Sequence, residues 1–498
     1  MSGGSWSRVT ASIRVSRKYP RLSRREHTVS AFAQPPQSSR TTCPVQPDVV
    51  SSSPSATATI DPHALFSAEV AQIRSQLCNL LTSSHPSLTE IASYYFRHPS
   101  KQIRPLLVLL FSRATNGLGS HFPVKAWAAE HSRLREEELD APLTRPDVLC
   151  DFNPSMPDHT ASFSTPFDLC SPSRRTYPSP PSTLYPSTSS PHVPVLSHSI
   201  LPTQMRLAQI VEMIHVASLL HDDVIDKSPL RRGAPSGPAV FGNKLAVLGG
   251  DFLLGRASAA ISRLGSAEVV ELCAGVIANL VEGEILQMSP SDLPEGTCHP
   301  LTSLSASPVN GAAAEINLDA LHASPSTPPP SVLSERWSTY LRKTYLKTAA
   351  LMAKGIRSAV VLGGCRDGEV WKEVAYAYGR NLGLAFQLVD DVLDFSSSGS
   401  LGKPGSGADL RLGLATGPVL YAAEEYPELE PMIARAFNEE GDVERALTLV
   451  LASSGVERTR ELAMAHADKA REVLQLLPPS DAREGLVALT ERVVKRVR

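Results

Sequence analysis

Two short runs of acidic residues stand out because their aspartates recur at helical spacing. The first run, Asp-Asp-Val-Ile-Asp, begins at Asp222, and the second, Asp-Asp-Val-Leu-Asp, begins at Asp390. Residues i and i+4 lie on one face of a helix, so Asp222 and Asp226 present two carboxylates to the same point. Asp390 and Asp394 repeat the arrangement. Such hard oxygen ligands suit Mg²⁺, which keeps several waters and bridges to substrate phosphates. The spacing therefore predicts two magnesium-binding motifs.

Apolar residues precede both runs, from Ile210 to Leu220 and from Leu382 to Val389. Unpaired carboxylates in such helices would be costly to bury, so bound cations are expected to neutralise them. A solvated helix face is the alternative for a single acidic run, but two copies in apolar helices argue against it. A carboxylate-bridged di-iron centre needs Glu-x-x-His on each of two helices. Only Glu212-Met-Ile-His215 matches, and no second copy accompanies Asp390.

Basic side chains near these motifs complete a site for phosphate. Arg231 and Arg232 follow the first motif closely, and a planar guanidinium suits phosphate oxygens. Lys101 and Arg104 open a helix, where the backbone dipole favours anions. Lysines and a threonine within residues 343–348 break another apolar helix. Each group alone is typical of a surface charge cluster, but together with two magnesium motifs they predict a diphosphate site.

The elements that must position these groups are helices. Apolar residues recur at helical spacing in three stretches, which run from Asp61 to Ala114, from Gln204 to Met288 and from Ser334 to Arg498. Residues 115–202 and 289–333 are rich in Ser and Pro and lack this pattern, so they are predicted to be disordered insertions. β-Branched residues occur inside helical patterns and not in alternating runs. The fold class is therefore predicted to be all-α, with one domain over residues 61–498 that is interrupted twice.

Composition excludes several classes of protein. The chain has 48 Lys+Arg against 50 Asp+Glu, so no basic field indicates nucleic acid as a partner. Its seven cysteines are scattered and form no Cys-x-x-Cys pair, which indicates ordinary thiols. Lys347, Lys354 and Arg357 interrupt an apolar stretch of nearly membrane-spanning length. We expect a soluble or peripheral membrane protein.

The N-terminal segment has the composition of a targeting sequence. Its first 47 residues contain eight Arg or Lys, many serines and a single acid, Glu26. This Arg-rich, Ser-rich and acid-poor composition is typical of an organellar transit peptide, with a disordered basic tail as the alternative. Residues 1–50 are predicted to direct the protein to the mitochondrial matrix, at or near the inner membrane.

The two motif regions resemble those of trans-isoprenyl diphosphate synthases, and more narrowly of the long-chain polyprenyl synthases that make the ubiquinone side chain. Residues 212–233, Glu-Met-Ile-His through Arg-Arg-Gly, are similar to the family's first aspartate-rich region, and residues 383–395 to its second. The resemblance covers roughly residues 61–114, 201–288 and 335–498. It implies an isoprenoid-synthase-type helical bundle around a central cavity, with two to three Mg²⁺ ions per active site. It also implies a homodimer, with a heteromer as the alternative, and peripheral membrane contact for product release.

The resemblance also implies a role for each matching residue. The catalytic residues that bind magnesium would be Asp222, Asp226, Asp390 and Asp394. The allylic diphosphate would contact Arg231, Lys347, Thr348, Gln387 and Lys403. Isopentenyl diphosphate would contact Lys101, Arg104, His215 and Arg232. His215 lies about two turns before the first motif, so it can share that face, although a core histidine is the alternative. The family's Gly-Lys-Arg reads Ser100-Lys101-Gln102 here, and the loss of one cation is expected to weaken this site.

The implied reaction condenses isopentenyl diphosphate with farnesyl or geranylgeranyl diphosphate. The C–O bond of the allylic diphosphate ionises, the isopentenyl double bond attacks the allylic cation, and a proton is lost, with electrostatic stabilisation of the departing diphosphate as the protein's main contribution. The growing hydrocarbon needs a dry tunnel beneath Asp222. Ala217 and Ser218, about one turn earlier, are too small to block it. A long product, C30 to C50, is expected.

Three other functions are weighed against this one. A short-chain farnesyl or geranylgeranyl synthase is disfavoured by the small residues Ala217 and Ser218. A terpene cyclase would not need a second diphosphate site at Lys101, Arg104 and His215. A noncatalytic subunit of a heteromeric synthase would be expected to have lost an aspartate motif, and both are intact here.

Overall fold

The computed structural model of the protein describes residues 60–131 except 84 and 99, and then residues 139, 178–185, 197, 199–288, 332–395 and 407–496. The predicted transit peptide at residues 1–50, Lys403 and most of the two predicted insertions lie outside the described residues. The prediction that the insertions are disordered therefore stays a prediction.

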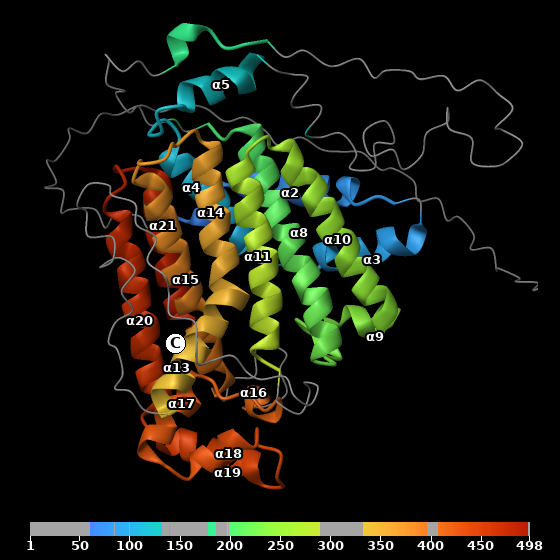
Figure 1. The fold of residues 1–498 in the computed structure, drawn as a ribbon, viewed down its shortest axis with the longest axis vertical. Coiled ribbons are helices and arrows are strands. Elements are labelled where there is room, and N and C mark those ends of the chain that lie inside the picture. Colours follow the sequence, from blue (N-terminus) through green and yellow to red (C-terminus); the bar gives the residue numbers. More distant parts are fainter. Residues whose placement is uncertain are drawn as a thin grey trace, which may run out of the picture. The chain divides into compact units, whose positions relative to one another are not determined.

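Helices make up almost all of the described structure, so the predicted all-α fold class is confirmed (Figure 1). The α-helices are α1 (Pro62–Leu65), α2 (Ser67–Leu80), α3 (Pro86–Arg97), α4 (Ile103–Thr115), α5 (Phe122–His131), α8 (Pro202–Ile225), α9 (Gly237–Phe241), α10 (Asn243–Arg263), α11 (Ala267–Ile285), α13 (Val332–Thr344), α14 (Ala350–Leu362), α15 (Trp371–Asp394), α16 (Ala408–Arg411), α17 (Gly417–Glu425), α18 (Leu429–Ala434), α19 (Asp442–Ala452), α20 (Gly455–Leu474) and α21 (Asp481–Lys495). A 3-10 turn, η2 (Ser182–Leu184), a π-helix, η4 (Tyr345–Ala349), and a hairpin of β1 (Leu230–Arg231) and β2 (Ala234–Pro235) complete the described elements.

One boundary differs from the sequence prediction. The helical pattern was expected to stop near residue 115, but α5 (Phe122–His131) lies beyond that point. Phe122 is buried, which shows why a segment of Ala, Trp and Val can still form a helix there. The long Ser/Pro-rich sequence that follows masked this short apolar segment.

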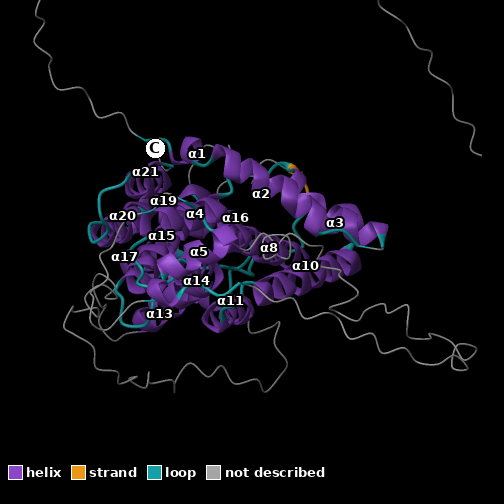
Figure 2. Cartoon of the chain, turned by 90° about the horizontal axis from the view of Figure 1, so that it is seen from above, coloured by secondary structure: helices purple, strands orange, loops and turns teal. Residues whose placement is uncertain are grey.

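Helix α8 lies at the centre of the arrangement because it is apolar on almost every side. Leu207, Ile210 and Ile214 are fully buried, as expected for a helix without a polar stripe. It packs against α4, α10 and α14, while α14 also packs against α11 and α15 (Figures 1 and 2). On its other side α15 packs against α20 and α21. The helices that carry the two aspartate motifs, α8 and α15, are thus held through α14, which touches both.

A buried amide pair fixes where α8 begins. Gln204 Nε2 donates to Asn116 Oδ1 at 2.8 Å, and Asn116 Nδ2 donates to Gln204 Oε1 at 2.9 Å. The same Gln204 oxygen accepts the N–H of Leu201 at 3.0 Å, which satisfies one free donor of the helix start. Pro202 at the first helical position needs no such partner.

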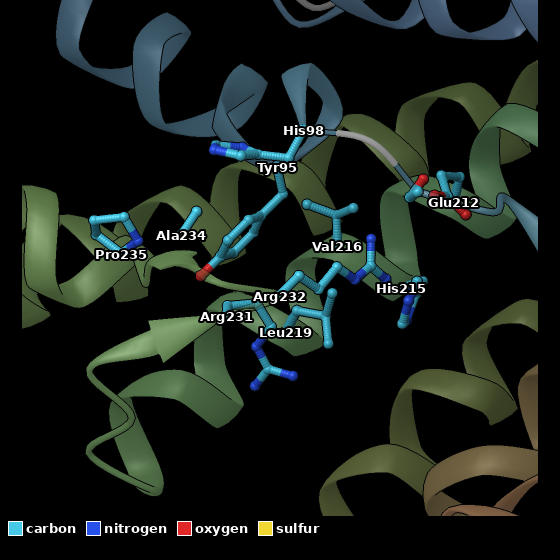
Figure 3. Close-up of a pocket in the computed structure, with 11 residues that line it drawn as sticks. Tyr95, His98, Glu212, His215, Val216, Leu219, Arg231, Arg232, Ala234 and Pro235 are labelled. Carbon is cyan, nitrogen blue, oxygen red and sulfur yellow. The ribbon is translucent and has the colours of Figure 1, made fainter. Parts of the chain in front are cut away.

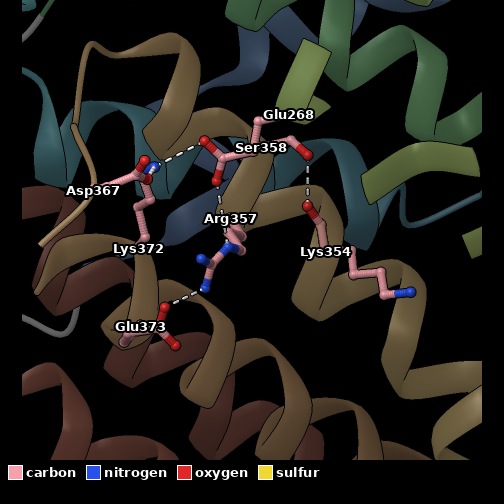
Figure 4. Close-up of polar contacts among 7 residues, drawn as sticks. All are labelled: Glu268, Lys354, Arg357, Ser358, Asp367, Lys372 and Glu373. Carbon is pink, nitrogen blue, oxygen red and sulfur yellow. Dashed lines mark hydrogen bonds and ion pairs between the residues drawn. The ribbon is translucent and has the colours of Figure 1, made fainter. Parts of the chain in front are cut away.

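Charged side chains tie α11, α14 and α15 together near the N-terminal end of α15 (Figure 4). Lys372 Nζ lies 2.8 Å from Glu268 and 2.7 Å from Asp367, and Arg357 Nη1 lies 2.5 Å from Glu373. Lys372 is buried, so these partners offset the cost of removing its charge from water. The second aspartate motif lies at the opposite end of α15.

Helix α10 has 21 residues and a mean hydropathy of 1.3 in its most apolar window, so by length and composition it could cross a membrane. Core helices of soluble proteins meet the same test, which makes this weak evidence. About 39% of that window is buried, and Val247 and Leu248 are exposed.

Helix α15 approaches η4 and α14 backbone to backbone at two glycines. A Cβ atom on Gly383 would lie 2.5 Å from the Cα of Ala349, and one on Gly379 would lie 2.7 Å from the Cα of Ala353. Real Cβ atoms do not come so close, so only glycine permits this separation. The close approach places the second motif beside η4.

Substitution of Gly383 by alanine should therefore destabilise the fold. We expect the free energy of unfolding to fall by about 1–3 kcal/mol, because the added methyl forces two backbones apart. Gly275→Ala in α11 is the matched control, since its new methyl would meet only the flexible Lys354 ammonium. Urea titration followed by circular dichroism measures both. Equal stability of the Gly383→Ala variant and the wild type would contradict the proposed close packing.

Candidate active site

Both aspartate motifs lie at the C-terminal ends of their helices. Asp226 caps the end of α8, and Asp394 is the last residue of α15. The backbone dipole already places partial negative charge at such an end, so carboxylates there are disfavoured unless cations balance them. The placement is what a site for metal ions requires.

The middle aspartate of the first motif is a buried anchor. Asp223 is fully buried and accepts hydrogen bonds from Arg231 Nε at 2.8 Å and from the Tyr95 hydroxyl. The Tyr95 oxygen in turn accepts the Gly237 N–H at 2.7 Å. Asp223 therefore joins α8 to α3, to the hairpin and to α9, and it orients the Arg231 guanidinium.

The pKa values of both outer aspartates of the first motif are raised. Burial raises the pKa of Asp222 to about 7, with Glu284 and Asp226 adding to the rise and Lys347 and Arg231 opposing it. Burial likewise raises the pKa of Asp226. Two desolvated carboxylates that repel each other fit a bound cation.

Within the described part of the chain, no group of three His, Cys, Asp or Glu side chains converges in a way that could hold a metal ion by itself. Asp223 is committed to Tyr95 and Arg231, so only two carboxylates of this motif remain. Mg²⁺ is commonly bound by one or two carboxylates plus substrate phosphates and water. The donor set fits Mg²⁺ on that basis.

The hairpin after α8 positions the two arginines. Arg231 pairs with Ala234 across the strands, which leaves Arg232 and Gly233 as a two-residue turn. Both have positive φ, 54° and 78°, as a type I′ turn requires. A non-glycine residue in this region is uncommon and points to a functional constraint at Arg232.

Three of the residues predicted to hold isopentenyl diphosphate are brought together. Arg104 Nη1 lies 3.0 Å from His215 Nε2. Arginine can only donate, so this His215 nitrogen accepts and the ring is neutral with its proton on Nδ1. Burial, together with Arg104 and Arg232, lowers the pKa of His215 well below its usual value. Lys101 is exposed, and its contact with isopentenyl diphosphate stays a prediction.

A pocket opens beside this cluster (Figure 3). Tyr95 reaches it from α3, Arg231 and Arg232 from the hairpin, and Glu212 and His215 from α8. Burial raises the pKa of Glu212, while Arg104 and Arg232 act to lower it. The lining of the pocket combines two arginines with one buried acid.

Three of the residues predicted to contact the allylic diphosphate, Lys347, Thr348 and Gln387, lie on the neighbouring elements η4 and α15. Lys347 Nζ lies 2.5 Å from Glu284 and 3.0 Å from Gln287 of the segment at the end of α11. The Thr348 hydroxyl donates to Gln387 Oε1 at 2.9 Å. Lys347 and Thr348 both lie in the π-helix η4, an irregularity often found at functional sites.

The second motif repeats the buried middle aspartate. Asp391 accepts from the Tyr340 hydroxyl at 2.5 Å and from Gln387 Nε2 at 2.9 Å. Of the outer pair, Asp390 lies 3.1 Å from Arg496 Nη2. Asp394 accepts the N–H groups that begin α16, at 3.1 and 3.0 Å. Asp390 and Asp394 therefore have protein partners, and their role as magnesium ligands stays a prediction.

The two small residues predicted to border a tunnel lie on different sides of α8. Ser218 is four residues before Asp222, about 40° around the helix, and its hydroxyl donates to the His215 carbonyl at 2.9 Å. Ala217, five residues before, is about 140° around and fully buried.

Several residues of this site were missed by the sequence reasoning. Tyr95 and Tyr340 lie far in sequence from the motifs they contact, and Glu284 lies far from its partner Lys347. Single residues of these types carry no local signal. Glu212 was considered only as a di-iron ligand. The pair Glu284 and Gln287, three residues apart at the end of an apolar helix, is the one signal that could have been noticed.

Comparisons with known proteins agree with this geometry. The family model for polyprenyl synthetase matches residues 192–303 and 321–450. A probable mitochondrial hexaprenyl pyrophosphate synthase from Neurospora crassa is 44% identical, with 88% of this chain and 82% of that protein covered. The mitochondrial hexaprenyl pyrophosphate synthase of Saccharomyces cerevisiae is 42% identical, over 88% of this chain and 90% of that protein.

A solved structure shares the arrangement of helices. It is a polyprenyl synthase from Caulobacter crescentus in complex with calcium and isoprenyl diphosphate, 25% identical, with a TM-score of 0.57 over 89% of this chain and all of that one. The predicted isoprenoid-synthase fold is thereby confirmed. With paired carboxylates, flanking cations and these relatives in agreement, the chain belongs to the polyprenyl synthetase family.

Proposed function

We propose that the protein is a magnesium-dependent trans-polyprenyl diphosphate synthase of mitochondria that makes a long-chain product for the ubiquinone side chain. It condenses isopentenyl diphosphate with farnesyl or geranylgeranyl diphosphate to give a C30 to C50 chain. The observation that carries the proposal is the desolvated pair Asp222 and Asp226 beside Lys347 and Arg231. The relatives described as mitochondrial hexaprenyl synthases support the long-chain product and the location.

The outer aspartates of both motifs would hold two to three Mg²⁺ ions, which supply positive charge to the diphosphate leaving group. Arg231, oriented by Asp223, and Thr348, oriented by Gln387, would contact the allylic diphosphate. Lys347 and Lys403 belong to the same proposed set. These contacts favour transfer of the C–O bond electrons to the departing oxygen.

The second substrate would be held by Arg104, Arg232, His215 and Lys101. Because His215 is neutral, it contributes a hydrogen bond and leaves the charge balance to the arginines. The isopentenyl double bond then attacks the allylic carbon, and the proton lost from the new chain passes to the released diphosphate.

We further propose a homodimer and peripheral contact with the membrane. Apolar side chains are exposed on the consecutive helices α10 and α11, at Val247, Leu248, Val270, Val281 and Ile285. Large apolar side chains gathered on two adjacent helices are typical of an interface, and a second copy of this chain is the proposed occupant. A long hydrocarbon product has little solubility in water, which favours release at a lipid surface.

The Asp222→Ala variant tests the magnesium site. We expect a loss of prenyl transfer of about 10²- to 10³-fold, because charge on the leaving group is no longer balanced. Isopentenyl diphosphate incorporation, measured with farnesyl diphosphate and Mg²⁺, reports this, and EDTA should abolish the wild-type signal. Asp468→Ala, at an exposed position of α20, is the control. Unchanged turnover in Asp222→Ala would rule out the assignment.

Magnesium affinity should depend on pH. The raised pKa of Asp222, about 7, means that the metal-free protein holds a proton there at pH values where an unfolded chain does not. Mg²⁺ must displace that proton, so affinity rises as pH increases toward 7 and levels off above it. Calorimetric titration with Mg²⁺ alone at pH 6 and pH 8 measures this. Affinity equal at both values, or an Asp222→Asn variant with the same pH dependence, would be incompatible with the assignment.

The Ala217→Phe variant tests the proposed product length. A phenylalanine at this buried position should block a growing chain and shorten the product, while Ser218→Ala should leave it unchanged. The same change at exposed Ala434 in α18 controls for the added ring. Products made from farnesyl diphosphate, isopentenyl diphosphate and Mg²⁺ are sized by chromatography. Full-length chains from Ala217→Phe would place the tunnel elsewhere.

A further inference from the structure

The same arrangement occurs at the middle aspartate of both motifs. Asp223 and Asp391 are 0% and 2% exposed, and each accepts a hydrogen bond from a tyrosine hydroxyl. The tyrosines come from different helices, Tyr95 from α3 and Tyr340 from α13. Neither is near its motif in sequence, so the repetition arises only in the folded chain.

Both oxygens of each middle carboxylate accept a hydrogen bond. On Asp223, the Tyr95 hydroxyl binds Oδ2 and Arg231 binds Oδ1. On Asp391, the Tyr340 hydroxyl binds Oδ2 and Gln387 binds Oδ1. Hydrogen bonds to an ionised oxygen are the stronger kind, and a carboxylate held on both sides is constrained in orientation. It has little freedom to turn toward a cation.

We propose that Tyr95 and Tyr340 are positioning residues, each of which holds the middle aspartate of its motif away from the metal ions so that it does not compete for them. This inference rests on the proposed magnesium sites. A middle carboxylate released from its tyrosine could rotate, compete for a cation and disturb the geometry of the outer pair.

Each tyrosine also positions a residue proposed to touch diphosphate. Through Asp223, Tyr95 fixes Arg231, and it lines the pocket that contains Arg232 and His215 (Figure 3). Tyr340 fixes Gln387 through Asp391, and Gln387 accepts the hydroxyl of Thr348. Residues that hydrogen-bond to the groups around a metal, without touching the metal, orient those groups, and their loss weakens metal binding or activity.

The test compares Tyr95→Phe and Tyr340→Phe with variants that lose a hydroxyl elsewhere. Tyr94→Phe is the first control, because the Tyr94 hydroxyl bonds the Pro235 carbonyl of the same hairpin at 2.9 Å without touching an aspartate. Tyr345→Phe is the second, because the Tyr345 hydroxyl shares a hydrogen bond with the Tyr376 hydroxyl, at 2.7 Å. Mg²⁺ binding is titrated calorimetrically in the presence of inorganic diphosphate.

We expect Mg²⁺ to bind each of the two test variants about ten-fold more weakly, at the low end of what the loss of an outer partner costs. Both controls should bind it like the wild type. The Mg²⁺ concentration for half-maximal turnover should rise in parallel, while KM for isopentenyl diphosphate at saturating Mg²⁺ stays unchanged in Tyr340→Phe. A purely structural role would lower the melting temperature and leave Mg²⁺ affinity as it was.

Wild-type Mg²⁺ affinity in folded Tyr95→Phe and Tyr340→Phe would overturn the inference. Asp222→Ala in the same titration tests the proposed magnesium site separately from the role of the tyrosines. If this variant also binds Mg²⁺ normally, the proposed magnesium site itself is wrong. Circular dichroism checks folding. If Tyr95→Phe does not fold because the Gly237 N–H is left without its acceptor, Tyr340→Phe decides the matter, since each tyrosine is predicted to act on its own motif.

Discussion

Negative charge concentrated at the C-terminal ends of two buried helices is the constraint on which the rest of the site depends. The last turns of α8 and α15 carry three aspartates each, where the backbone dipole is also negative. Burial makes this charge more costly, as the raised pKa values of Asp222 and Asp391, both about 7, show. Carboxylates that repel one another and are removed from water are destabilising, and bound cations together with a diphosphate would offset that cost.

The surrounding structure divides this charge into two kinds. The middle aspartates are satisfied within the protein, by tyrosines together with Arg231 or Gln387. Burial raises the pKa of the outer aspartates of the first motif, and Lys347 and Arg231 oppose that rise only in part. Packing then fixes where the two motifs stand: α14 touches both α8 and α15, and Gly379 and Gly383 bring α14 and α15 into backbone contact. The fold thus holds the charged ends rigidly and leaves part of their charge unbalanced.

Sequence reasoning reached the helices and the two motifs, because helical periodicity and i, i+4 spacing are local signals. The association of Arg104 with His215 was implied only by the family resemblance. It could not separate the middle aspartates from the outer ones, since Tyr95 and Tyr340 act across long sequence separations. The π-helix at Lys347 was also out of reach, because its extra residue per turn arises from packing and not from a recognisable pattern. Helix α5 was overlooked for a different reason, because a short apolar segment adjoins a long Ser/Pro-rich one.

The most direct measurement is a crystal structure of the protein with Mg²⁺ and diphosphate bound. The account predicts Mg–O distances of about 2.0–2.1 Å to the outer aspartates, with diphosphate oxygens and water completing the coordination. It also predicts that Asp223 stays bonded to Tyr95 and Asp391 to Tyr340. A middle aspartate in direct contact with Mg²⁺, or ions bound away from Asp222 and Asp226, would contradict it.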